Sequence, residues 1–199
     1  MADDPAAAAS PRIGRVEVIC GPMFAGKTEE LLRRVRRAVI AGRHVVVISH
    51  ALDDRYGTAR LGSHAGLEYP SVAVSTADAI EAVVPADAEV VAIDEAQFFG
   101  PGLIPVVDRL AARALVVIVA GLDVTFEGEP FEPLPSLMAL AERVDKLTAI
   151  CSTCGEEAVF HIRVAGRPVG PEALVEANVG GSETYQARCR RHVKEPRAA

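Results

Sequence analysis

The stretch that decides the fold is Gly21-Pro22-Met23-Phe24-Ala25-Gly26-Lys27-Thr28. It has the spacing G-x-x-x-x-G-K-[ST] of a phosphate-binding loop, and a chance match in a glycine-containing turn is the alternative. An apolar run at residues 16–20 precedes it and a helical pattern at 29–41 follows, which is the strand–loop–helix context that the motif needs. Glycines let backbone N–H groups turn toward phosphate oxygens, and the helix adds its positive N-terminal end. We therefore predict that all eight residues bind a nucleoside triphosphate, with Lys27 at the β- and γ-phosphates and the Thr28 hydroxyl at Mg²⁺.

Composition restricts the class of protein. The chain has 199 residues, half of them hydrophobic, and a net charge of −6, which suits one sizeable domain with a small appendage and argues against stable nucleic-acid binding. A local basic stretch, Arg33, Arg34, Arg36 and Arg37, is interpreted as a solvated helix face. No apolar run reaches the roughly 20 residues of a membrane span, and the first residues are acidic where a signal peptide is basic. We expect a cytoplasmic protein that makes no membrane contact, with its cysteines reduced or bound to metal.

Short β-branched runs alternate with helical patterns along most of the chain. We predict strands at residues 16–20, 44–49, 72–75, 89–93, 115–120 and 146–150. We predict helices at residues 29–41, 77–83, 102–113 and 135–144. This alternation is typical of an α/β fold with an open, mostly parallel sheet and flanking helices, like that of phosphate-loop NTPases, with its ligand site at the carboxyl ends of the strands.

The pattern also divides the chain into regions. We expect a loose N-terminal tail at 1–11, an α/β nucleotide-binding domain at 12–150, a small zinc domain at 151–193 and a C-terminal tail at 194–199. Residues 56–69 lose periodicity and gain glycines, so they form either a long mobile loop or a poorly patterned hairpin.

An acidic pair, Asp94-Glu95, ends the apolar run at 89–93. In a protein with a phosphate loop, Asp94 would orient Mg²⁺, directly or through water, and Glu95 could act as general base toward an acceptor hydroxyl or toward water. A polar turn after a strand is the alternative. These two carboxylates alone do not separate a kinase from an ATPase.

Four residues near the C-terminus have the spacing of a structural zinc site. Cys151 and Cys154 form C-x₂-C, and Cys189 and His192 form C-x₂-H. The segment between them has few large apolar residues, so we expect a metal to hold its ends together. A redox role for the first pair and a surface position for His192 are the alternatives. Cys20, in the first strand, is interpreted as a small buried hydrophobe rather than a nucleophile.

Taken in order, these motifs resemble the type II thymidine kinases, the zinc-containing cytosolic kind, over residues 14–193. The resemblance rests on Gly-Pro-Met-Phe-Ala-Gly-Lys-Thr at 21–28, Ile-Asp-Glu-Ala-Gln-Phe-Phe at 93–99, Ala-Gly-Leu-Asp at 120–123 with Phe126, Pro130-Phe131 and Pro133 after it, the Cys/His frame, and Val-Gly-Gly-Ser-Glu-Thr-Tyr at 179–185. The chain departs from the family pattern at 161–163, His-Ile-Arg, where a small hydroxyl residue is common before the arginine.

The resemblance implies ATP-dependent phosphorylation of the 5′-hydroxyl of thymidine, giving thymidine monophosphate (dTMP) and ADP. It implies that Glu95 is the general base, that Asp94 is associated with magnesium and that Arg163 lies near the phosphates. It also implies an apolar wall around the thymine ring, made of Met23, Phe98, Leu122, Phe126, Phe131 and Tyr185. For Leu122 and Phe131 a place in the core is the alternative. The backbone at Val179, Gly180 and Gly181 would read the base edge.

The resemblance further implies feedback inhibition by thymidine triphosphate (dTTP) and a homotetramer. Two other functions stay open at the level of the residues. One is a nucleic-acid-dependent ATPase that grips DNA with its zinc domain, against which the acidic composition argues. The other is a regulatory nucleotide-binding module without turnover, against which the intact Asp94-Glu95 pair argues.

Overall fold

A parallel sheet organises the larger part of the molecule. The computed structural model describes residues 13–52, 60–62, 68–164 and 184–194. Its main sheet comprises β1 (Arg15–Cys20), β2 (Val45–His50), β5 (Val72–Val74), β6 (Val90–Ile93), β7 (Val116–Gly121) and β8 (Arg143–Lys146). The strands lie in the order β5-β2-β6-β7-β1-β8, and every neighbouring pair is parallel. The predicted α/β class with a mostly parallel sheet is confirmed.

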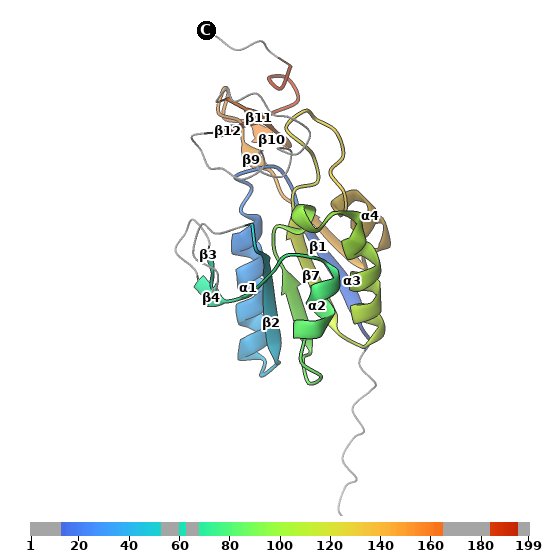
Figure 1. Cartoon of the computed structure of the whole chain (residues 1–199). Helices are drawn as coiled ribbons and strands as arrows, with labels where there is room; N and C mark the ends of the chain where they lie inside the picture. The colour runs from blue at the N-terminus through green and yellow to red at the C-terminus, as the bar shows by residue number, and fades with distance from the viewer. Residues whose placement is uncertain (1–12, 53–59, 63–67, 165–183, 195–199) are drawn as a thin grey trace, which may run out of the picture.

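Helices cover both faces of this sheet (Figure 1). They are α1 (Lys27–Ile40) on one face and α2 (Asp78–Val83), α3 (Leu103–Ala112) and α4 (Leu134–Leu140) on the other. Side chains alternate between the faces: Val16 and Val18 join the core under α2–α4, whereas Ile19 joins Leu31 and Leu32 under α1. None of the described helices is long and apolar enough to cross a membrane.

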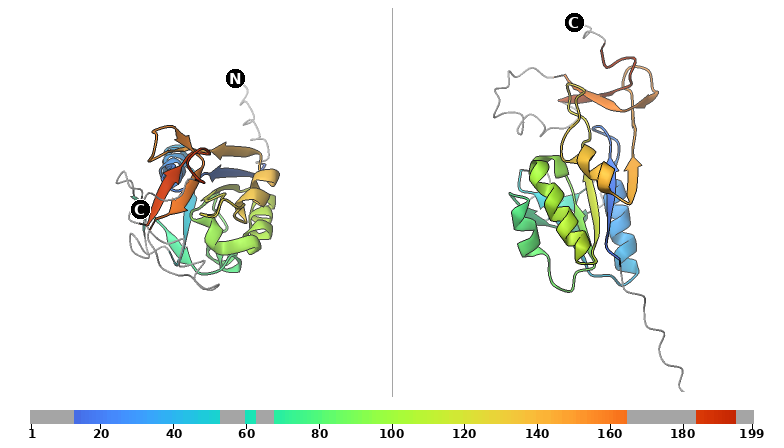
Figure 2. Two further views of the ribbon diagram at one scale, coloured as in Figure 1. Left: turned by 90° about the horizontal axis from the view of Figure 1, so that it is seen from above. Right: turned by 90° about the vertical axis from the view of Figure 1, so that its right-hand side faces the viewer.

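The smaller elements lie outside the main sheet. They are β3 (Arg60–Gly62), β4 (Glu68–Pro70), the 3₁₀ segment η1 (Ala96–Gly102), β9 (Ala149–Ile150), β10 (Glu157–Ala158), β11 (Phe160–Arg163) and β12 (Tyr185–Arg188). β3 and β4 pair antiparallel, as in the hairpin alternative for this region. β9–β10 and β11–β12 form two antiparallel ribbons. Figures 1 and 2 show these ribbons beyond the end of the sheet where β1 finishes and the phosphate loop begins.

Two elements near the last strand of the sheet have other bounds than predicted. The predicted helix at 135–144 stops at Leu140, and the predicted strand at 146–150 is two elements, β8 and β9. The reason is that Glu142 is hydrogen-bonded to β1. Its backbone N–H donates to the carbonyl oxygen of Val16 (3.1 Å), and its carboxylate accepts from the N–H of Val16 (2.7 Å). These long-range hydrogen bonds hold the chain extended where local propensity favours helix.

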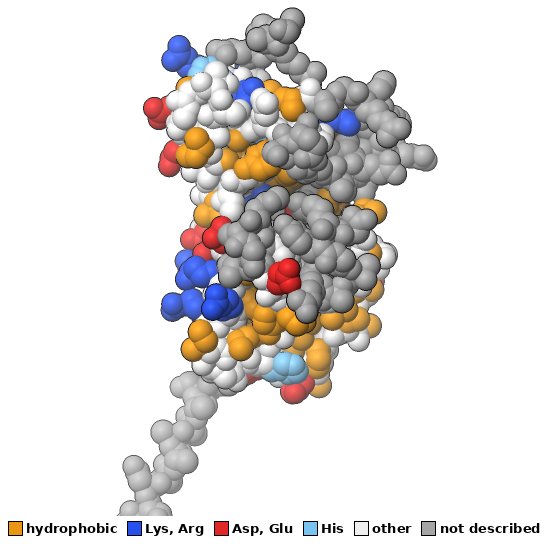
Figure 3. Space-filling model, turned by 90° about the vertical axis from the view of Figure 1, so that its left-hand side faces the viewer, with side chains coloured by type: hydrophobic (Ala, Val, Ile, Leu, Met, Phe, Trp, Pro, Cys, Tyr) orange, Lys and Arg blue, Asp and Glu red, His pale blue; other side chains and the backbone are white. Residues whose placement is uncertain are grey.

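The basic stretch of α1 is only partly solvated, so its interpretation as a solvated face was wrong for Arg34. That side chain is 7% exposed and pairs with Glu17 (2.8 Å), Glu30 (2.9 Å) and Asp145 (2.6 Å). The other three arginines are exposed, and basic side chains gather on the face of the molecule that Figure 3 shows. Arg34 faces the sheet because it follows Leu31 by three residues, which places both on the inward side of the helix.

Candidate active site and metal centre

The phosphate-binding loop has the backbone that its glycines were expected to permit. Gly26 has φ 79° and immediately precedes α1. Gly21 has φ 148°, and a Cβ there would lie 2.5 Å from the carbonyl oxygen of Leu147, so no other residue fits without movement. Phe24 has φ 68° without being glycine. Strain of this kind is concentrated at ligand sites, and the loop therefore carries a geometry suited to phosphate binding rather than to an ordinary turn.

Two polar residues of the loop meet the strand ends. Lys27 donates from Nζ to the carbonyl oxygen of Pro22 (2.8 Å), so its side chain folds back over the loop. Thr28 donates from Oγ1 to Oδ2 of Asp94 (2.8 Å), and Asp94 is buried directly after β6. The hydroxyl and the carboxylate come from distant parts of the chain, and both offer the hard oxygen ligands that Mg²⁺ prefers. The donor set fits the magnesium role predicted for it.

The predicted base, Glu95, is held by a residue that the sequence interpretation did not assign. Glu95 has φ 49° and is half-buried. The Gln97 amide donates to its carboxylate, and Gln97 Oε1 accepts from the backbone N–H of Leu122 (3.0 Å). Gln97 therefore links the carboxylate to the end of β7. Its position inside the 93–99 motif was the signal that could have identified it.

The predicted wall residues lie on several segments at the same edge of the sheet. Leu122 and Tyr185 are 1% exposed, and the other four are partly buried: Met23, Phe98, Phe126 and Phe131. Phe126 lies in a turn in which Thr125 donates its N–H to Glu129 (2.8 Å). Val179, Gly180 and Gly181 lie outside the described residues, so their predicted contact with the base edge has no structural counterpart here.

Arg163 lies at the end of β11, directly opposite Tyr185 in the register of the β11–β12 ribbon. It is partly buried. This places the predicted arginine on the ribbon that sits over the phosphate-loop end of the sheet (Figure 2).

The four predicted zinc ligands come together. The ligand atoms of Cys151, Cys154, Cys189 and His192 all lie within 4.8 Å of one another. Cys154 Sγ is 3.8 Å from Cys189 Sγ, and His192 Nδ1 is 3.6 Å from Cys151 Sγ and 3.3 Å from Cys189 Sγ. A tetrahedral ion with metal–sulfur bonds of about 2.3 Å needs sulfur atoms about 3.8 Å apart. The cluster fits a zinc ion, and His192 is buried within it rather than on the surface.

The cysteines of the two regions differ in the pKa of their thiols. Burial opposes ionisation of Cys151, but backbone hydrogen bonds from Cys189, Thr153 and Cys154 outweigh it and lower the pKa of the thiol to about 5. A thiolate is the form that binds metal. Burial, with the Asp123 carboxylate, instead raises the pKa of Cys20 to about 12. Cys20 is fully buried, which confirms the predicted buried position of this side chain.

The Cys/His cluster packs directly against the phosphate loop. A small core of Ala149, Cys151, Ala158 and Ala187 lies beside the ligands, and Ala25 of the loop packs against it. The two ribbons, the Cys/His cluster and the phosphate loop therefore share one small core.

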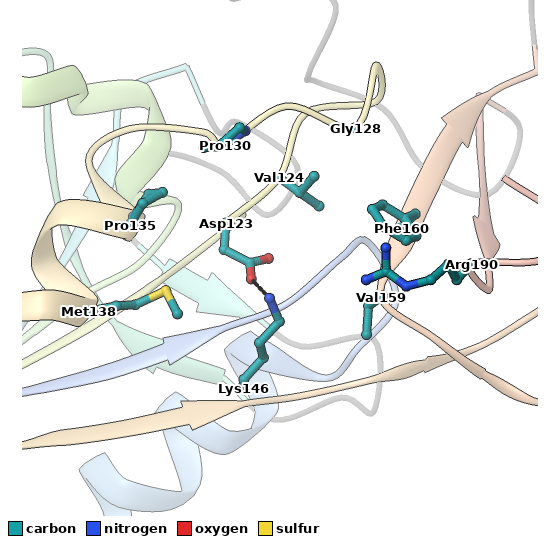
Figure 4. Close-up of a pocket in the computed structure, with 10 residues that line it drawn as sticks. All are labelled: Asp123, Val124, Gly128, Pro130, Pro135, Met138, Lys146, Val159, Phe160 and Arg190. Atoms are coloured by element: carbon teal, nitrogen blue, oxygen red, sulfur yellow. Dashed lines mark ion pairs between the residues drawn. The ribbon is translucent and has the colours of Figure 1, made fainter. Parts of the chain in front are cut away.

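A cavity of about 340 Å³ lies beside this junction (Figure 4). Asp123 and Lys146 form an ion pair of 2.6 Å on one side, and Arg190 lies 5.1 Å from the Phe160 ring centre on the other. None of the six predicted wall residues lines it. It is therefore distinct from the predicted nucleoside wall.

Comparisons with known proteins agree with this arrangement of motifs. The family model described as thymidine kinase matches residues 14–193. A thymidine kinase of Halobacterium salinarum is 51% identical over 184 residues, covering 89% of this chain and 92% of the relative. One of Coprothermobacter proteolyticus is 49% identical over 187 residues, covering 92% of each chain, and one of Deinococcus radiodurans is 45% identical over 185 residues, covering 87% of each. The chain belongs to the thymidine kinase family.

Proposed function

We propose that this chain transfers the γ-phosphoryl group of ATP to the 5′-hydroxyl of thymidine, forming dTMP and ADP. The observation that carries the proposal is the contact between the phosphate loop and the acidic pair: Thr28 donates to Asp94, and Glu95 follows Asp94 beyond the carboxyl end of β6. Membership of the thymidine kinase family supports thymidine as the acceptor.

In this proposal each charged group has one task. Residues 21–28 hold the ATP phosphates, Lys27 and Arg163 offset the charge that develops during transfer, and Mg²⁺, held by Thr28 and Asp94, supplies further neutralisation when bound. Glu95 accepts the proton of the 5′-hydroxyl. A bond forms between O5′ and the γ-phosphorus, the bond from that phosphorus to the bridging oxygen breaks, and ADP leaves.

The nucleoside that accepts the phosphoryl group is positioned by the residues around Glu95. Gln97 holds Glu95 relative to the backbone of Leu122, so the base and one wall residue share a support. The apolar wall takes a flat base, and backbone groups at 179–181 read its polar edge. Wall residues are Met23, Phe98, Leu122, Phe126, Phe131 and Tyr185.

Several further properties belong to the proposal. A structural zinc ion is bound by the three cysteines and His192, and the donor geometry supports this. Feedback inhibition by dTTP, a homotetramer, a cytoplasmic location and the absence of stable nucleic-acid binding follow from the family and the acidic composition. The proposed domain division remains 12–150 and 151–193, with tails at 1–11 and 194–199.

The test is acceptor-dependent release of ADP. Mg·ATP is incubated with thymidine, deoxycytidine, deoxyadenosine or no nucleoside, and the product mass is measured. We expect release only with thymidine, together with formation of dTMP. Equal release without a nucleoside would mean that water is the acceptor, and the chain would then be an ATPase.

A further inference from the structure

A hollow lined by arginines lies at the amino-terminal ends of the strands of the main sheet. Its volume is about 310 Å³, which is within the range of small-ligand pockets. Its walls come from the second half of α1, from the turn after that helix and from the first residues of β1, β6, β7 and β8. A smaller hollow of about 160 Å³ shares Arg15, Arg43 and Val116 with it and extends it.

This arginine hollow is separate from the proposed active site. The phosphate loop lies at the carboxyl end of β1 and leads into the first residue of α1, whereas the hollow lies beside the last turns of that helix. α1 has 14 residues, and an α-helix rises about 1.5 Å per residue, so its two ends are about 20 Å apart. No residue of the phosphate loop or of the predicted nucleoside wall lines the hollow.

The hollow concentrates positive charge on an acidic protein. Six arginines line it: Arg15, Arg33, Arg34, Arg37, Arg43 and Arg143. Three carboxylates pair with members of this group: Glu17, Glu30 and Asp145. Three positive charges therefore stay unbalanced, although the chain as a whole has a net charge of −6. Figure 3 views the side of the molecule that carries α1 and shows basic side chains gathered there.

The unbalanced charge belongs to particular side chains. Buried Arg34 lies 2.6–2.9 Å from all three carboxylates, so it holds the acids in place. Among the described residues, neither Arg37 nor Arg43 has a carboxylate within ion-pair distance. One cation in the last turn of a helix offsets the negative end of the helix, which accounts for Arg37 at most. The guanidinium donors of both residues are thus available to an anion.

The geometry of the guanidinium group selects the kind of anion. Its fork of N–H donors matches phosphate oxygens in pairs, and several guanidinium groups around one hollow suit a ligand with several phosphate groups. A long polyanion would extend beyond the hollow onto the rest of an acidic surface, which repels it. A small oligophosphate stays within the basic hollow, so it is the ligand that the charges favour.

We propose that the arginine hollow is a second anion site, which binds a small ligand with two or more phosphate groups through Arg37 and Arg43. An inorganic oligophosphate and the phosphate tail of a nucleotide share this chemistry. The inference is independent of the proposed function, because the hollow shares no residue with the proposed active site.

The experiment counts binding events by isothermal titration calorimetry at low ionic strength, with inorganic tripolyphosphate as the probe. The variant Arg37→Gln/Arg43→Gln is compared with Arg36→Gln/Arg113→Gln. Both lose two exposed arginines, but neither Arg36 nor Arg113 lines the hollow. We expect the wild type to bind tripolyphosphate at the phosphate loop and in the hollow. The first variant should lose one event or bind it at least tenfold more weakly, as expected when charge-assisted hydrogen bonds are removed, and the second should keep both.

A second titration identifies the source of the phosphate groups. If a non-hydrolysable ATP analogue also shows an event that Arg37→Gln/Arg43→Gln loses, the site takes nucleotides. If only tripolyphosphate shows that event, the site takes inorganic oligophosphates. Equal weakening of tripolyphosphate binding in the two double variants would indicate diffuse surface charge and overturn the proposal, as would unchanged binding in Arg37→Gln/Arg43→Gln.

A measurement on the wild-type protein needs no variant. Tripolyphosphate should shift the backbone amide resonances of residues 37–43 as well as those of residues 21–28. Shifts confined to 21–28 overturn the second site. Shifts at 37–43 alone support it and count against the phosphate loop instead, so a failure of the proposed function can be told apart from a failure of this inference.

Discussion

The parallel sheet and the Cys/His region are held together by different forces. Val, Leu and Ile side chains fill both faces of the sheet, and burial of that apolar surface stabilises it. Among the residues that the structure describes, the core beside the Cys/His cluster has four buried members, three of them alanines: Ala149, Cys151, Ala158 and Ala187. So small a core provides little stabilisation. The comparison teaches that apolar burial suffices to stabilise the sheet, whereas we expect the Cys/His region to depend on a bound metal.

The two regions also contribute different residues to the proposed site. The carboxyl ends of the central strands contribute Lys27, Thr28 and Asp94, which suit phosphate and Mg²⁺. The ribbon beyond them contributes Tyr185, a residue of the proposed nucleoside wall. Binding of ATP and binding of thymidine should therefore respond to different perturbations.

The largest expected effect comes from removing the general base while both regions stay folded. Glu95→Gln retains the shape of the side chain but cannot accept the proton, so phosphoryl transfer should fall about 10²- to 10⁴-fold while ATP still binds. Turnover and ATP affinity are measured on the same preparation. Glu129→Gln, an exposed carboxylate in the turn after β7, is the control. Transfer near the wild-type rate would remove Glu95 as the base.

The next change tests the stability of the sheet alone. Arg34→Met removes the buried member of the two arginines, Arg34 and Arg15, that each lie 2.8 Å from buried Glu17, and breaking a buried ion pair typically costs about 3–5 kcal/mol. The free energy of unfolding, measured with denaturant, should fall by that order, and the zinc content should stay constant. Exposed Arg36→Met is the matched control. Equal effects of the two substitutions would contradict the buried network.

Acid should weaken the same network by a smaller amount. Hydrogen bonding from Arg33, with a further bond from Arg34, lowers the pKa of Glu30 from 4.5 to about 2. The stabilisation is present above the unfolded pKa and is lost as the pH falls through the folded value. Between about pH 4.5 and pH 2 the Tm of the wild type should therefore drop more steeply than that of Glu30→Gln. Parallel Tm curves would show that Glu30 adds no pH-dependent stability.

The smallest effect is an expected absence of reaction. Iodoacetamide at mildly alkaline pH should leave Cys20 unmodified in the folded protein, because its thiol is buried and its pKa is raised to about 12. After chelation, Cys151, Cys154 and Cys189 should become alkylated. Peptide mass spectrometry distinguishes the sites. Modification of Cys20 without unfolding would show that the first strand is open to solvent.

Much of the fold and site could be predicted because the signals are local. The phosphate loop, the Asp94-Glu95 pair and the C-x₂-C/H pairs are each short patterns next to a strand end. Arg34 could not be identified as buried, because its partners Glu17 and Asp145 come from other elements. The end of α4 depended on Glu142 bonding to the distant edge of β1.

The sequence interpretation did not assign Gln97 for a related reason. Gln97 acts by joining Glu95 to Leu122, which lies 25 positions further along the chain.

The central claim is that the Cys/His region serves thymidine binding and the sheet serves ATP binding. The most direct test is to remove the metal and to measure the binding of each ligand separately. Zinc content is determined on the purified protein, and the Kd values for thymidine and for a non-hydrolysable ATP analogue are measured before and after chelation. We expect one zinc ion per chain, a weaker Kd for thymidine after chelation and a nearly constant Kd for the ATP analogue. Purified protein without zinc, or thymidine binding that is indifferent to chelation, would contradict the account.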